Sequence, residues 1–103
     1  MTFEEAQRQL ARHRARIDEI DVAILELINQ RTEVVEEIGR IKRQLRLPIY
    51  EPKREDDVYR NLARNNRGPL SQEAVRRVFE RIIEEMRTLQ SERWPDDAQQ
   101  AQK

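Results

Sequence analysis

Apolar side chains recur along residues 10–45 at the spacing expected for one buried face of a helix. Two series of positions, each with a step of seven residues, form this seam. The first series is Leu10, Ile17, Ile24, Arg31, Ile38 and Leu45, and the second is His13, Ile20, Leu27, Val34 and Ile41. Only Arg31 and His13 are not aliphatic, and no proline interrupts the pattern. It predicts one long amphipathic helix from about Phe3 to Leu45.

A helix of this length is too long for a compact chain of 103 residues. At roughly 1.5 Å per residue it extends about 60 Å, whereas a domain of about 100 residues has a radius of gyration of about 13 Å. Part of the seam would remain in water unless a second chain covered it. We therefore expect an obligate, intertwined homodimer whose two long helices pair antiparallel and cross near Leu25.

Prolines mark the end of the first helix and the start of a second. Pro48 disfavours helix at Leu47, and Pro52 fits the first turn of a helix predicted over about 52–65. Glu55 lies in that first turn, where an acidic group meets the positive end of the helix dipole. The inward residues of this helix are Val58, Leu62 and Tyr59.

A third helix completes the predicted fold. Gly68 is expected to cap the second helix in a left-handed conformation, Pro69 blocks its continuation, and Ser71 caps a helix that reaches about Arg93. The apolar stripe of this third helix is Val75, Val78, Phe79, Ile82, Ile83, Met86 and Leu89, with Gln90 next on the same face. The chain is thus predicted to be all-α, with a helical domain over 1–94 and a polar, disordered tail over 95–103.

Composition narrows the class of partners. Lys plus Arg and Asp plus Glu both number 20, so no basic excess favours nucleic acid or an acidic membrane. The chain has no cysteine, which excludes disulfides and thiol chemistry. The residues near the N-terminus contain no apolar run of the kind that a signal peptide or a membrane anchor has. We expect a cytoplasmic protein that binds neither nucleic acid nor membrane.

Arg31 breaks the seam and allows two interpretations. One polar residue can fix the register of paired helices, or its stem can lie on the core while its head reaches water. Alternatively, its guanidinium pairs with a bound anion, because an isolated buried charge is costly. Lys42 projects from nearly the same face about 16 Å further along. Arg14 lies about 26 Å before Arg31, too far for one small ligand, but the partner's Arg14 would come close in an antiparallel pair.

Other polar residues give weaker signals when each is taken alone. Gln90 continues an apolar stripe, yet such a residue often lies at a rim in contact with water. Arg54 and Glu55 are typical of a solvated first turn. His13 has no second ligand at metal spacing, and Asp21 suits a structural ion pair with an arginine. No metal site is therefore predicted.

An ordered set of motifs runs through the chain, together with a "GPL" turn: Arg14-x-x-Ile17-x-x-Ile20-Asp21, Arg31, Gly39-x-x-Lys42, Pro52-x-Arg54-Glu55 and Gln90. In combination these residues resemble the AroQ-class chorismate mutases, which are all-helical enzymes that convert chorismate to prephenate in aromatic amino acid biosynthesis. The resemblance covers about Ala6 to Glu92.

The resemblance implies an intertwined dimer with two shared sites, and it implies roles for single residues. Arg31 and the partner's Arg14 would bind the two substrate carboxylates, while Lys42 and Gln90 would donate to the ether oxygen. Glu55 would accept from the ring hydroxyl. The remaining binding residues are Arg54, which shapes the pocket, Glu51, which stands where some members carry aspartate near that hydroxyl, and Met86, which replaces a small polar residue found in some members.

These residue types suit the reaction that the family catalyses. A [3,3] rearrangement within one molecule needs no nucleophile, metal or redox cofactor, so no cofactor is expected. It needs the reacting arm to be held over the ring, and it needs fixed donors where negative charge builds on the ether oxygen. Arginine suits carboxylates because its planar fork binds both oxygens.

Two alternatives remain open from the sequence. An isochorismate pyruvate-lyase would use a related helical dimer on a closely similar substrate, although Glu55 suits a hydroxyl at the chorismate position. A non-catalytic helical dimer that binds and regulates another shikimate-pathway enzyme belongs to a different class. A regulatory partner enzyme is also compatible with the mutase itself.

Overall fold

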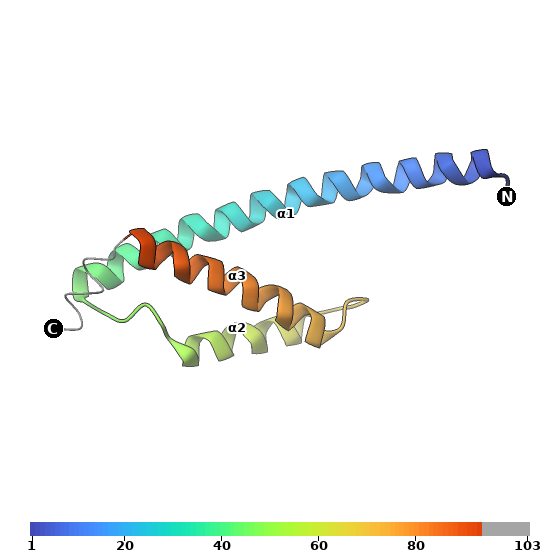
Figure 1. Ribbon diagram of the computed structural model, residues 1–103. Helices are drawn as coiled ribbons and strands as arrows, with labels where there is room; N and C mark the ends of the chain where they lie inside the picture. Colours follow the sequence, from blue (N-terminus) through green and yellow to red (C-terminus); the bar gives the residue numbers. More distant parts are fainter. Residues whose placement is uncertain (94–103) are drawn as a thin grey trace. The chain divides into compact units, whose positions relative to one another are not determined.

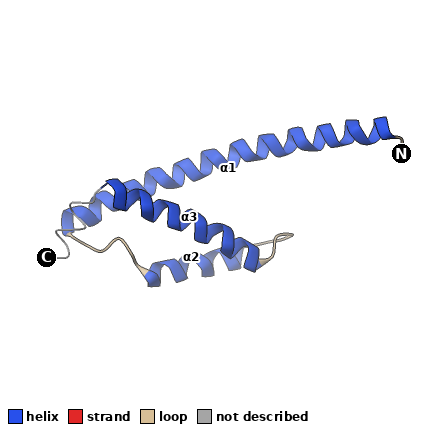
Figure 2. Cartoon of the chain, in the orientation of Figure 1, coloured by secondary structure: helices blue, strands red, loops and turns tan. Residues whose placement is uncertain are grey.

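A computed structural model describes residues 1–93, and they form three helices with no strand among them. Helix α1 spans Phe3–Leu45, α2 spans Pro52–Asn65 and α3 spans Gln72–Arg93 (Figures 1 and 2). The predicted all-α class and the helix bounds are confirmed. The tail predicted over 95–103 lies outside the described residues. Within them, no helix combines the length and the apolar character that crossing a bilayer requires.

The chain divides into two compact units, one over residues 1–33 and one from Val34 onward. The first unit consists of the N-terminal part of α1. A capping box closes its start: the Glu5 N–H donates to Thr2 Oγ1 at 3.1 Å, and the Thr2 N–H donates to Glu5 Oε2 at 3.2 Å. These two bonds satisfy backbone donors that the first turn would otherwise leave unpaired.

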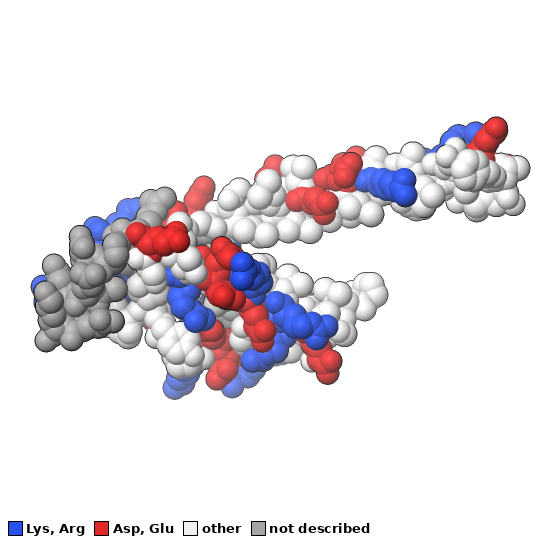
Figure 3. Space-filling view, viewed as in Figure 1, with Lys and Arg blue, Asp and Glu red and all other residues white. Residues whose placement is uncertain are grey.

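The aliphatic seam of α1 is open to solvent in the single chain. Its side chains have exposed fractions from 41% at Ile20 to 67% at Leu45. Long uncharged stretches lie between the charged groups along the N-terminal part of α1 (Figure 3). An apolar stripe of this extent is typical of a surface that another protein covers.

The second unit begins with the last turns of α1, which end in a Schellman motif. The Leu47 N–H donates to the Lys42 carbonyl at 2.8 Å, and the Arg46 N–H donates to the Arg43 carbonyl at 3.2 Å. Arg46 takes the left-handed position with φ 54°, a place that glycine usually fills. The helix thus ends before Pro48, and the chain turns toward α2.

Helices α2 and α3 pack against each other as a hairpin (Figure 1). The prediction that Gly68 caps α2 is wrong, because the residue that caps α2 is Asn66, in an extended conformation. Gly68 does have a positive φ, 69°, but two residues later, where its N–H donates to Asn66 Oδ1 at 2.9 Å. The side-chain amide of Asn66 thus organises the turn, as asparagine often does.

Helix α3 begins and packs largely as predicted. Ser71 caps it, since its Oγ accepts the Ala74 N–H at 3.1 Å. Most of the predicted apolar stripe is half-buried, and Met86 is 5% exposed. Val78 is the exception, because 52% of it faces solvent in the single chain.

Candidate active site

Lys42 is held at the end of α1 by two acceptors. Its Nζ lies 2.8 Å from Glu51 Oε1 and donates to the Ile49 carbonyl at 3.0 Å. The Lys42 side chain is 14% exposed, whereas Glu51 is 44% exposed. An ammonium group has three donors, so one hydrogen remains for a ligand. Glu51, which the family resemblance associated with a ring hydroxyl, here serves as the counterion of Lys42.

Gln90 joins the last turns of α3 to α1. Its side chain is 6% exposed, and its Nε2 donates to the Val35 carbonyl at 3.1 Å. Val35 and Lys42 are seven residues apart, about two helical turns or roughly 10 Å, and therefore lie on nearly the same face. The Gln90 amide and the Lys42 ammonium are thus both brought to this face of residues 34–45. Gly39, which lies between them along α1, is buried.

Glu55 has a partner that the sequence analysis did not identify. Arg87 Nη2 donates to Glu55 Oε1 at 3.0 Å and to Oε2 at 2.9 Å. The Arg87 guanidinium carbon also lies 4.7 Å from the centre of the Tyr50 ring, within the range of a cation–π interaction. The first turn of α2, the connection before it and the last turns of α3 therefore meet at this group.

The other predicted binding residues of α2 and α3 differ in their exposure. Arg54 is exposed on the first turn of α2. The hydrogen bond from Arg60 lowers the pKa of the nearby Asp57 carboxyl, and the charge of Arg54 lowers it further. Met86 is buried one turn before Gln90, and its thioether has no hydrogen to donate to a carboxylate.

Arg14 and Arg31 belong to the unit formed by residues 1–33. Arg14 is exposed, and Arg31 is half-buried. The half-burial of Arg31 fits its place in the seam, where neighbouring positions are aliphatic. The carboxylate-binding roles of both arginines stay predictions.

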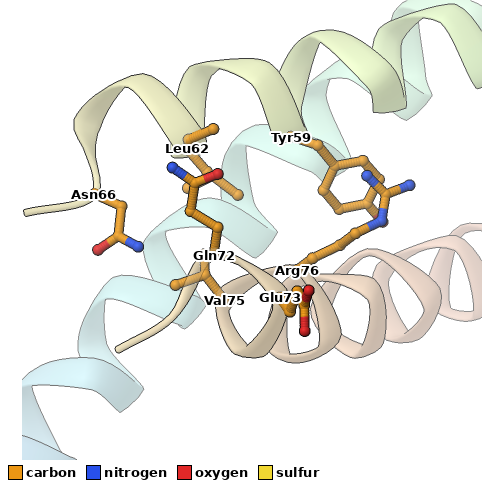
Figure 4. A pocket seen from close by; sticks show the side chains of 8 residues that line it. Tyr59, Leu62, Asn66, Gln72, Glu73, Val75 and Arg76 are labelled. Atoms are coloured by element: carbon orange, nitrogen blue, oxygen red, sulfur yellow. The ribbon is translucent and has the colours of Figure 1, made fainter. Parts of the chain in front are cut away.

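A separate pocket of about 220 Å³ lies between α2 and α3 (Figure 4). Its lining includes Tyr59, Leu62 and Val75 but none of the predicted site residues. Arg76 lies over the Tyr59 ring with its guanidinium carbon 4.0 Å from the ring centre. Burial raises the pKa of the Tyr59 phenol, and the carboxylates of Glu80 and Glu55 raise it further.

Hydrogen-bond donors dominate the side chains that converge in the second unit. Within residues 1–93, no group of three His, Asp or Glu side chains could hold a metal ion. What residues 34–93 do assemble is a set of donors, from Lys42, Arg87 and Gln90, and two ion-paired carboxylates, those of Glu51 and Glu55. Such a set can bind and polarise an anionic ligand.

Comparison with known proteins identifies a family that this chain matches. The family model described as chorismate mutase type II matches residues 13–91. A chorismate mutase of Methanocaldococcus jannaschii is 34% identical over 85 residues, which cover 82% of this chain and 86% of that protein. A chorismate mutase structure from Thermus thermophilus superposes with a TM-score of 0.78 at 34% identity, covering 81% of this chain and 94% of that one.

Longer proteins contain a similar segment. A bifunctional chorismate mutase/prephenate dehydratase of Aquifex aeolicus is 37% identical over 79 residues, and one of Pseudomonas aeruginosa is 38% identical over 82. These matches cover 73% and 75% of this chain, but 22% of each relative. The chain thus spans about a fifth of the length of these bifunctional relatives.

Proposed function

The chain belongs to the type II chorismate mutase family, and on this premise we propose that it converts chorismate to prephenate. One observation carries the proposal beyond family membership. The buried Gln90 amide is fixed by the Val35 carbonyl of α1, and the Lys42 ammonium, about two turns further along the same helix, is fixed by the Ile49 carbonyl. Two fixed donors in a water-poor place are what an ether oxygen needs when its bond to carbon lengthens.

The reaction itself is a [3,3] rearrangement in which a carbon–oxygen bond breaks as a carbon–carbon bond forms. No group is transferred to the protein, so the side chains act by orientation and electrostatics. Holding the enolpyruvyl arm over the ring removes much of the entropic part of the barrier. Lys42 and Gln90 then stabilise the negative charge that develops on the ether oxygen. Both interactions strengthen toward the transition state and therefore raise kcat.

The remaining roles concern binding. We assign the two substrate carboxylates to Arg31 and to the partner's Arg14, because guanidinium forks bind carboxylates through two parallel hydrogen bonds. Glu55 accepts from the ring hydroxyl. Glu51 holds Lys42 in place, Arg54 shapes the pocket, and Met86 forms an apolar wall beside Gln90.

The shared site requires a homodimer, which the open seam of α1 supports. Aliphatic side chains that are 41% to 67% exposed over many helical turns would cost considerable free energy in water. An antiparallel pairing of two α1 helices covers this surface and carries each Arg14 to the other chain's site. Dimer formation and site formation are then one event.

Direct assay tests the proposed activity. We expect the purified protein to consume chorismate and to release prephenate, and we expect no salicylate or pyruvate from isochorismate. In the proposed role, Glu55 accepts from a hydroxyl at the chorismate position, which disfavours the lyase. Salicylate plus pyruvate as the products would identify an isochorismate pyruvate-lyase. No turnover of either substrate would identify a non-catalytic helical dimer.

Gln90 predicts how the rate depends on pH. An amide donates without titrating, so we expect kcat/KM to be constant from about pH 6 to pH 8. In the variant Gln90→Glu the donor exists only while the new carboxyl is protonated. Its kcat/KM should therefore fall about tenfold per pH unit above the pKa of that carboxyl. A wild-type protein that turns over chorismate only in acid would contradict the role of Gln90.

A partner enzyme and a cellular location are also proposed. The fusion of similar domains to prephenate dehydratase in the bifunctional relatives supports a partner enzyme that acts on the same pathway. Prephenate would then pass to a following reaction nearby. The absence of cysteine is compatible with the predicted cytoplasmic location, which stays a prediction.

A further inference from the structure

Arg87 forms an ion pair that links α3 to α2. Its Nη2 bonds both oxygens of Glu55, a residue 32 positions earlier. The Glu55 side chain is 22% exposed and Arg87 is 39% exposed. By contrast, Arg81 on the same helix pairs with Glu84 and Glu85 within its own exposed face. Exposed ion pairs of that kind contribute little to stability. A partly buried ion pair between two helices restricts the positions of both side chains.

Tyr50 also contacts the Arg87 guanidinium. Its ring centre lies 4.7 Å from the Arg87 guanidinium carbon, and stacking of this kind favours a planar cation over a flexible ammonium. Arg87 therefore touches a ring on the connection before α2 and a carboxylate in the first turn of α2. Arg87 is also three residues before Gln90 on α3, so the two side chains lie on neighbouring positions of one helix face.

We propose that Arg87 is a positioning residue that holds the Glu55 carboxylate for the hydroxyl of the substrate. This role rests on the proposed function and deepens it, because nothing in the family motifs involves position 87. Arg87 acts through Glu55 and does not itself touch the substrate. Tyr50 supports it by keeping the guanidinium plane in place.

Two physical effects support this role. A carboxylate has about four lone-pair sites, so Glu55 can accept from a hydroxyl while Arg87 occupies two of them. The pair also has no net charge, which matters because the substrate is a dianion and a lone carboxylate would repel it. Arg87 thus allows an acidic side chain to serve as acceptor without opposing substrate binding.

The effect should appear mainly in KM. The hydroxyl contact is present in the ground state and in the transition state alike, and loss of such uniform binding raises KM with little change in kcat. We expect Arg87→Met to raise KM for chorismate about tenfold, the size of one charge-assisted hydrogen bond. Arg87→Lys keeps the charge but not the stacked plane, and it should recover only part of this loss.

A double-mutant cycle separates positioning from other roles. Four proteins are compared by KM and kcat for chorismate: wild type, Arg87→Met, Glu55→Gln and the double variant. If Arg87 acts through Glu55, adding Arg87→Met to Glu55→Gln should change KM by less than about twofold. The matched control is Arg81→Met, which removes an exposed ion pair from the same helix and should leave both constants unchanged. Circular dichroism and sedimentation confirm that each variant keeps its helices and its oligomeric state.

Other outcomes overturn the proposal in distinguishable ways. If the two losses multiply, Arg87 acts independently of Glu55, by contacting the substrate itself or by supporting the fold. If Arg87→Met matches wild type, the ion pair has no role in binding. Both results leave the mutase activity intact. A wild-type protein that does not convert chorismate overturns the proposed function, and the positioning role with it.

Discussion

Replacing Lys42 by alanine is expected to lower kcat/KM for chorismate by at least about 1000-fold. Removing one neutral donor to a developing oxyanion costs roughly 100- to 1000-fold, and a charged donor contributes more. The loss should fall on kcat, because charge on the ether oxygen is greatest in the transition state. Steady-state rates of prephenate formation measure it. A variant within tenfold of wild type would show that Lys42 does not act on the reacting bond.

The fold should survive this change. Lys42 bonds the Ile49 carbonyl and pairs with Glu51, and Glu51 is exposed enough for water to solvate it when its partner is absent. We therefore expect the free energy of unfolding to fall by only about 1 kcal/mol. Lys53→Ala is the matched control, since Lys53 is exposed on the first turn of α2. It should keep the rate of the wild-type protein.

Mixing two inactive variants is expected to restore activity. In the proposed dimer each site takes Arg14 from the other chain, so Arg14→Ala should be nearly inactive. Lys42→Ala should be inactive for the reason given above. A heterodimer of the two has one site with both residues intact and one site with neither. When equal amounts of the two variants are unfolded and refolded together, about half of the dimers should be mixed. Because each mixed dimer has one intact site of two, about a quarter of the wild-type activity should return.

The complementation experiment also tests the dimer. Mixing Lys42→Ala with Gln90→Ala is the control, because both residues come from the same chain as the site, and no intact site can form. Sedimentation of the wild-type protein should give twice the mass of the 12.4 kDa chain. Equal recovery in both mixtures, or none in either, would contradict a site shared between chains.

The helices could be predicted closely because their boundaries depend on local chemistry. Pro52 and Ser71 each favour a helix start through the backbone of the first helical turn. In the structure α2 begins at Pro52 and α3 begins directly after Ser71. Gly68 misled the prediction because a positive φ can serve a loop as well as a helix end. Arg46 could not be anticipated, since its left-handed conformation goes against the preference of arginine.

Apart from the family resemblance, the sequence singled out proposed site residues most clearly where they interrupt an apolar pattern. Gln90 stands out at the end of the apolar stripe of α3, and the structure buries it against α1. Arg87 gives no such signal, because it is one of 20 basic residues in a chain rich in charged helical faces. Its partner Glu55 is 32 positions away, and only the packing of α3 against α2 brings the two together.

The hydrogen bond from Gln90 to the Val35 carbonyl has a consequence for which side chains position 90 tolerates. Its nitrogen has two hydrogens: one can remain anchored to the backbone while the other is aimed at the ligand. Protonated glutamic acid has a single acidic hydrogen and must choose between the two acceptors. Even at a pH where the new carboxyl is fully protonated, Gln90→Glu should therefore have a lower kcat/KM than the wild-type protein. Its single hydrogen cannot bond the Val35 carbonyl and the ligand at the same time.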